Sequence, residues 1–100
     1  MIQPMFLICL EEPELGLHPD AMSLLAELLL AASARTQVVV TTHSDSLLSH
    51  LSDHTDSVLV CEHPVDTTTI ERLDADQLKF WLDKYTLGEI WLAGKLGGNP

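Results

Sequence analysis

The sequence predicts an α/β fold with a mainly parallel sheet, flanking helices and, towards the C-terminus, a β-hairpin followed by helices. Two short apolar runs, residues 5–10 and 37–42, enclose a segment with helical periodicity, which is the pattern of a strand–helix–strand unit. Both runs end abruptly in polar residues. The length of 100 residues, with 46% hydrophobic and 20% charged residues, fits one small globular domain.

The first half of the chain has the pattern of a strand, a helix and a second strand. Residues 5–10 (MFLICL) are continuously apolar, which predicts a strand buried on both faces. Pro19 and Asp20 suit the first turn of a helix that continues to about residue 34. Residues 37–42 (QVVVTT) are largely β-branched and predict a second buried strand, parallel to the first. The apolar residues of the helix form one stripe that should face inward: Leu17, Ala21, Leu24, Leu25, Leu28 and Ala32.

The second half predicts a short helix, a hairpin and two further helices. Ser44 can cap a helix over residues 45–51. Residues 57–62 (SVLVCE) and 67–73 (TTTIERL) alternate enough to pair as antiparallel strands. Asp74 precedes a helix whose apolar residues keep helical spacing, and a last helix is expected over residues 87–96 before the terminal Gly-Gly-Asn-Pro.

The charge balance limits the partners of this chain. It has 15 Asp and Glu against 5 Lys and Arg, a formal net charge of −10, so it is poorly suited to bind nucleic acid alone. The same excess does not exclude Mg²⁺, which prefers carboxylate ligands. Cys9 and Cys61 lie in apolar runs outside any C-x-x-C pair, and we expect them to be buried free thiols. With no signal-like start and no apolar run long enough to cross a bilayer, we expect a cytoplasmic protein without membrane contact.

Polar residues follow both strands of the predicted parallel pair. Glu11 and Glu12 end the first strand, and Thr41-Thr42-His43-Ser44 ends the second. If the strands are neighbours, these groups face one crevice at the carboxyl edge of the sheet, where α/β folds bind ligands. Two acids can hold a metal ion and orient water, and an imidazole can donate to a phosphate. Each motif alone is more often a solvated strand end, but their combination indicates phosphoryl transfer.

Three linked segments resemble the second half of ABC-type ATPase heads, in particular the RecF/OLD/SMC-like branch of the P-loop NTPases, with an AAA-type core. They are residues 6–14 (FLICLEEPE), 15–19 (LGLHP) and 39–44 (VVTTHS). The resemblance implies that Glu11 is the Walker B acid that holds Mg²⁺ through water and that Glu12 is the catalytic carboxylate. It further implies that Leu17 and His18 lie in the D-loop, near the nucleotide of a partner head, and that His43 is the switch histidine. Glu11 stands where most such proteins carry Asp.

The chain departs from this family pattern in one large respect. No G-x-x-x-x-G-K-[ST] occurs, and no Ser-Gly-Gly-Gln-like signature segment is present. Residues 1–100 are therefore expected to be the C-terminal part of a single ATPase head that requires a missing N-terminal half, in cis or in trans. For the intact protein the resemblance implies ATP and Mg²⁺ as cofactors, a head-to-head dimer, and a nucleic acid or effector partner in a defence-related activity. The isolated chain should not hydrolyse ATP, because nothing in it cradles the phosphates.

Two other functions are compatible with parts of the sequence. The chain is also compatible with a non-enzymatic remnant or interaction module that keeps the fold without turnover. A metal-dependent nuclease of the Toprim type also uses acids at strand ends, but it needs a further acidic pair on a later strand. The third predicted strand ends in Cys61-Glu62-His63 and supplies none.

Overall fold

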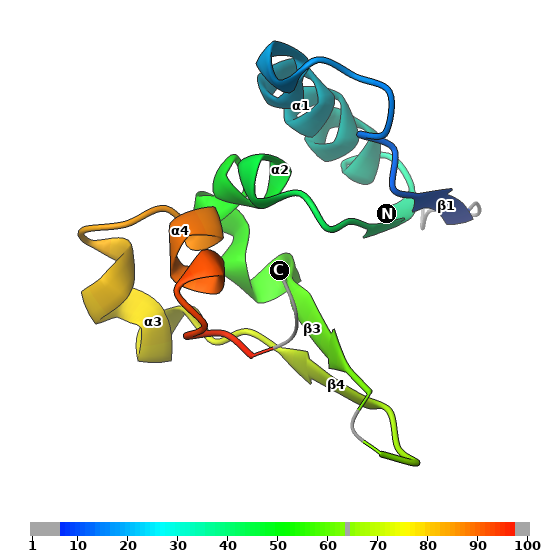
Figure 1. Cartoon of the computed structure of the whole chain (residues 1–100). Coiled ribbons are helices and arrows are strands. Elements are labelled where there is room, and N and C mark those ends of the chain that lie inside the picture. Colours follow the sequence, from blue (N-terminus) through cyan, green and yellow to red (C-terminus); the bar gives the residue numbers. More distant parts are fainter. Residues whose placement is uncertain (1–6, 64, 98–100) are drawn as a thin grey trace.

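The computed structural model describes residues 7–63 and 65–97, which alternate between strands and helices (Figure 1). The elements follow the predicted order, with short 3₁₀ turns added before α1 and after α2. They are β1 (Leu7–Glu11), η1 (Pro19–Ala21), α1 (Met22–Ser33), β2 (Gln37–Thr41), α2 (Asp45–Ser49), η2 (Ser52–Ser57), β3 (Leu59–Glu62), β4 (Thr69–Arg72), α3 (Ala75–Leu82) and α4 (Leu87–Leu92). Residues 5 and 6 of the first predicted strand lie outside the described residues. None of the helices in these two ranges has the length and apolarity needed to cross a membrane.

β1 and β2 pair in parallel, as their patterns predict. The register runs from Leu7 opposite Gln37 to Glu11 opposite Thr41. One further backbone bond, from Glu12 N to the Thr41 carbonyl at 2.8 Å, extends the pairing past the end of β1. Because the strands are parallel and end together, the residues that follow them leave the sheet at the same edge.

The predicted burial of these strands on both faces is wrong for this chain. All five residues of β1 are exposed, and Leu7 keeps 56% of its accessible surface. Cys9 and Cys61 are free but exposed, so their predicted burial is wrong too. The described residues place only two strands in this sheet, which is too few for the apolar side chains to be covered.

β3 and β4 form the predicted antiparallel hairpin, but the hairpin is not an addition to the parallel sheet. The described strands make two separate two-stranded sheets, β1–β2 and β3–β4. Figure 1 shows the hairpin projecting away from the helices. The helical segment formed by α2 and η2 separates β2 from β3 along the chain and places the hairpin apart from the first sheet. The expectation of one mainly parallel sheet is therefore corrected to one parallel and one antiparallel pair.

Two small apolar clusters form most of the core of residues 7–63 and 65–97, and α2 contributes to both. Leu47 packs with Met22 and Ala26 of α1, whereas Leu48 packs with Leu87 and Trp91 of α4. These adjacent residues point to different sides of α2, so this short helix joins the N-terminal and C-terminal halves (Figure 1).

The buried face of α1 differs from the predicted stripe. Leu24 and Leu28 were expected to face inward, but they are 58% and 59% exposed. Met22 and Ala26 are buried instead, with Leu25 and Leu29 packed partly against them. The helix meets α2 along this edge, and among the described residues nothing covers the side that carries Leu24 and Leu28.

Helix α4 is held closely against α2 and η2 through serine side chains. Ser49 Oγ accepts a hydrogen bond from Gly88 N at 3.1 Å, and Ser52 Oγ accepts one from Leu87 N at 2.9 Å. A Cβ atom at Gly88 would collide with the Asp45 carbonyl oxygen and with Ser49 Oγ, so this approach requires glycine. The helix ends at Leu92, earlier than predicted, with Ala93 as its C-cap and Gly94 at a φ of 78°.

Candidate functional site

The predicted acids and histidine come together at the carboxyl edge of the parallel sheet. β1 and β2 end at the paired residues Glu11 and Thr41. The turn after β1 carries Glu12, and the turn after β2 carries His43. Glu12 Oε1 lies 2.7 Å from His43 Nδ1, although 31 residues separate the two in sequence. The structure therefore joins the two predicted catalytic residues directly.

The Glu12–His43 contact is accessible to solvent. The His43 side chain is 73% exposed and that of Glu12 is 30% exposed. Solvent screens such a pair, so its contribution to stability is small. The contact sets the orientation of the imidazole ring. Because Nδ1 donates to Glu12, Nε2 is the ring nitrogen that remains free to bond another group.

Glu12 adopts a backbone conformation that is unusual for a non-glycine residue. Its φ is 45°, in the left-handed region, and Pro13 follows it. Such a conformation costs about 1–3 kcal/mol and persists only where the surroundings hold it. Here the Glu12 N–H donates to the Thr41 carbonyl, and the Glu12 carbonyl accepts from Leu15 N at 3.1 Å. This turn directs the carboxylate towards His43 and away from the continuation of the strand.

A second side-chain pair, Glu14 and Thr42, links the same two turns. Thr42 Oγ1 donates to Glu14 Oε1 and accepts a hydrogen bond from Ser44 N at 3.0 Å. Neither residue is among the catalytic, metal-binding or D-loop residues predicted from the sequence. Their positions in the sequence, close to Glu12 and His43, were the one indication that they belong to the site. The pairing between them could not be predicted, because it depends on the conformations of both turns.

The Glu14 side chain places a polar atom in an unfavourable environment. Its Oε2 atom is buried and has no hydrogen-bond partner among the described residues. A buried acceptor left in this state costs about 1–3 kcal/mol. Stability alone therefore does not account for a glutamate at this position.

Glu11, the predicted Mg²⁺ residue, is the exposed last residue of β1. Residues 7–63 and 65–97 contain no cluster of three or more His, Cys, Asp or Glu side chains able to hold a metal ion. Mg²⁺ commonly uses one or two carboxylates and takes its other ligands from water and substrate phosphates. The acids at this edge therefore do not form an all-protein cage for a metal ion, and their number is compatible with a largely hydrated ion.

Leu17 and His18 lie in the exposed loop that leads into η1, and no hydrogen bond joins His18 to Glu12 or His43 in the described part of the chain. Instead, His18 Nδ1 accepts a hydrogen bond from Asp20 N at 3.1 Å and caps η1. The same nitrogen is 3.5 Å from Asp20 Oδ2, an ion pair that requires it to be protonated. Nδ1 cannot accept the hydrogen bond from Asp20 N and also carry the proton that the ion pair requires, so the two interactions are mutually exclusive. We assign the capping bond, because its distance is the shorter of the two. The assignment of both residues to a partner's nucleotide remains a prediction.

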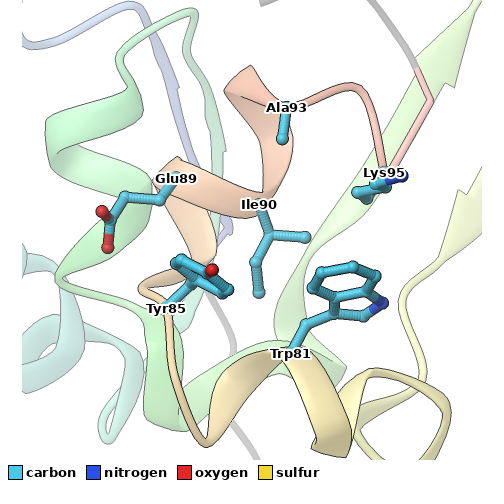
Figure 2. Close-up of a pocket in the computed structure, with 6 residues that line it drawn as sticks. All are labelled: Trp81, Tyr85, Glu89, Ile90, Ala93 and Lys95. Atoms are coloured by element: carbon cyan, nitrogen blue, oxygen red, sulfur yellow. The ribbon is translucent and has the colours of Figure 1, made fainter.

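A separate hollow lies between α3 and α4. Figure 2 shows Trp81 and Tyr85 around Ile90, with Lys95 beside the Trp81 ring. The hollow measures about 310 Å³, and Lys95 Nζ is 5.3 Å from the Trp81 ring centroid. Glu89 lines it, but this carboxylate already binds the Thr86 backbone N–H and hydroxyl, which lower its pKa. The hollow shares no residue with the Glu12–His43 site.

Comparisons with known proteins agree with an ATPase-like fold. Residues 4–49 match a protein family described as "AAA domain, putative AbiEii toxin, Type IV TA system", a segment that contains both Glu12 and His43. The fold is similar to a solved structure from a study of ATP-driven dimerization and DNA-stimulated activation of SMC ATPases, with a TM-score of 0.58 and 14% identity. That match covers 78% of this chain and 46% of the SMC structure, so the chain spans less than half of its length. No curated protein gives a significant match. The two similarities support the interpretation of the chain as part of a P-loop ATPase-like fold.

Proposed function

We propose that this chain is the part of an ATP-hydrolysing head that carries the catalytic carboxylate and the histidine. A second segment, in cis or in trans, would supply the phosphate-binding loop. The proposal depends mainly on one observation, the 2.7 Å contact between Glu12 and His43 at the carboxyl ends of adjacent parallel strands. The AAA-domain match over residues 4–49 supports it, because that match contains both residues.

In this proposal each residue of the edge has a separate task. Glu12 orients the attacking water and accepts its proton through Oε2, because Oε1 is bound to His43. His43, when both ring nitrogens carry protons, donates from Nε2 to a phosphate oxygen. Glu11 holds a water ligand of Mg²⁺. When bound, Mg²⁺ would offset the charge on the ATP phosphates.

The proposal includes a protein partner for the exposed sheet. Leu7, Ile8 and Val39 are 56%, 39% and 47% exposed. Apolar surface of this kind commonly marks an interaction site. We propose that the missing ATPase half covers it. By analogy with the SMC study named above, we also propose a head-to-head dimer in which Leu17 and His18 approach the partner's nucleotide, coupled to a nucleic acid or effector protein.

Phosphate release from Mg-ATP tests this function. The chain would be assayed alone and after co-expression with the reading frame directly upstream. We expect turnover only in the co-expressed sample, where the phosphate-binding loop is supplied, and loss of it in Glu12→Gln. Turnover by the chain alone, or turnover that survives Glu12→Gln, would contradict the assignment.

A non-enzymatic interaction module is the second candidate. It is favoured by the absence of G-x-x-x-x-G-K-[ST] from the sequence together with the exposure of both strands of the parallel sheet. A stable complex with the upstream product that binds but never hydrolyses ATP would select this alternative.

A further inference from the structure

We propose that Glu14 and Thr42 form a positioning bridge that holds His43 against Glu12. The inference rests on the proposed function for its purpose, but its geometry can be tested without any activity. In this assignment Glu14 and Thr42 contact neither the nucleotide nor the attacking water molecule. They act through His43.

The two turns need such a link because the backbone pairing stops before the site. The last backbone bond between them joins Glu12 N to the Thr41 carbonyl. Beyond it, the described hydrogen bonds between the two turns are both made by side chains, Thr42 to Glu14 and His43 to Glu12. The first of these pairs is half-buried, whereas His43 is largely exposed. The Glu14–Thr42 pair is therefore the firmer of the two links.

The Thr42 hydroxyl uses both of its hydrogen-bonding roles. It accepts from Ser44 N at 3.0 Å, so its own proton is directed to Glu14 Oε1. Ser44 in turn caps α2, because its Oγ accepts a hydrogen bond from Leu47 N at 3.1 Å. His43 lies between these two anchored residues. The bridge therefore connects the position of the imidazole both to the turn after β1 and to α2.

The burial of Glu14 also supports a positioning role. One oxygen accepts from Thr42, while the other is buried without a partner among the described residues. A buried polar atom without a partner is unfavourable, so packing alone does not explain a carboxylate at this position. The carboxylate is explained if its task is to accept the Thr42 hydroxyl.

The experiment reads the tautomer of His43 in the full chain by ¹H–¹⁵N NMR of the imidazole rings, at a pH where they are neutral. His43→Gln identifies the signal. We expect the wild-type ring to carry its proton mainly on Nδ1, because Glu12 accepts it there. Thr42→Val and Glu14→Leu should each lower the ratio of Nδ1–H to Nε2–H roughly two- to tenfold, the effect of losing one hydrogen bond. Thr42→Ser and Glu14→Gln keep the donor and the acceptor and should retain the wild-type ratio.

His63 provides an internal control. Its Nδ1 is 2.7 Å from Thr68 Oγ1 in the β3–β4 hairpin, so its tautomer should not change in any of these variants. An unchanged His43 ratio in folded Thr42→Val, or an equal change in Thr42→Ser, would overturn the bridge. Failure of the ATPase assay would leave this readout unaffected, so the two proposals fail separately. In an active complex, Thr42→Val should lower kcat and leave KM for ATP unchanged.

Discussion

Glu12 combines a strained backbone with the carboxylate of the proposed site. The left-handed φ of 45° turns the chain between β1 and Pro13, and the side chain then meets His43 at 2.7 Å. Backbone strain is commonly concentrated at functional residues, where it sets the direction of a side chain. The backbone conformation of Glu12 therefore lowers the stability of the chain but places the carboxylate against His43.

This opposition can be measured with two variants that both lose the carboxylate. Glycine adopts a positive φ without steric cost, whereas alanine does not. We expect Glu12→Gly to be more stable than Glu12→Ala by about 1 kcal/mol in urea denaturation. Equal stability of the two variants would show that residue 12 does not hold a left-handed conformation in solution.

At the scale of elements, α4 depends on its N-terminal capping box. Thr86 Oγ1 accepts from Glu89 N at 3.3 Å, and Glu89 Oε1 accepts from Thr86 N at 2.9 Å. The backbone bond to Thr86, and then the bond to its hydroxyl, lower the pKa of Glu89 from 4.5. A lowered folded-state pKa means that the ionised carboxylate stabilises the helix.

The pH dependence of stability follows from the sign of this shift. The contribution of Glu89 is fully present above its ordinary pKa of 4.5 and is lost as the pH falls through the lowered value. We expect wild type to have a higher Tm than Glu89→Gln near neutral pH, with the difference shrinking towards acid. Asp83→Asn, an exposed change of charge outside the capping box, is the control. A Tm difference between wild type and Glu89→Gln that is constant across this range would refute the proposed role of the ionised cap.

Because α4 contacts α2 at Gly88, we expect Gly88→Ala to destabilise the chain, which is the reverse of the usual effect of Gly→Ala in a helix. In an exposed helix, Gly→Ala normally stabilises by about 1 kcal/mol. At Gly88 the added methyl group meets the backbone of Asp45 and the side chain of Ser49, so we expect a loss of about 1–3 kcal/mol. Chemical denaturation measures the change. Leu92→Ala, at a residue that is 55% exposed on the same helix, should cost much less. A stabilised Gly88→Ala would mean that the two helices are not in this contact.

At the scale of the whole molecule, the core is small and most of the parallel sheet is uncovered. α2 joins two clusters, but neither reaches the strands of the β1–β2 pair. The chain covers 46% of the SMC structure that it resembles, and several apolar side chains of its parallel sheet are exposed. This exposed apolar surface is the observation from which we propose a protein partner.

Charged substitutions on this sheet should separate folding from association. Leu7→Lys and Val39→Lys replace residues that are 56% and 47% exposed, so the free energy of unfolding should change by only about 0.5 kcal/mol. If the proposed ATPase half binds this sheet, both variants should abolish co-purification with it. Val65→Lys, at a residue that is 90% exposed on the hairpin, should leave co-purification intact. Retained binding in both sheet variants would place the partner on another surface.

The sequence by itself determined the order of the elements and predicted that Glu12 and His43 share one edge if their strands are neighbours. Helix caps and strand runs are local features: Ser44 and Asp74, both predicted at helix starts, each cap a helix in the structure. The parallel pairing of β1 with β2 then places the residues that follow them at one edge. Both inferences need only periodicity, capping chemistry and the geometry of parallel strands.

Only the tertiary structure decided which surfaces are covered and which side chains pair around the site. The exposed faces of β1, the rotated inner face of α1 and the separate hairpin all depend on which elements are present to pack against them. The capping role of His18 and the Glu14–Thr42 bridge depend on turn conformations that apolar patterns do not encode. Burial and the Glu14–Thr42 pairing are properties of the folded chain, because each requires groups that are distant in the sequence.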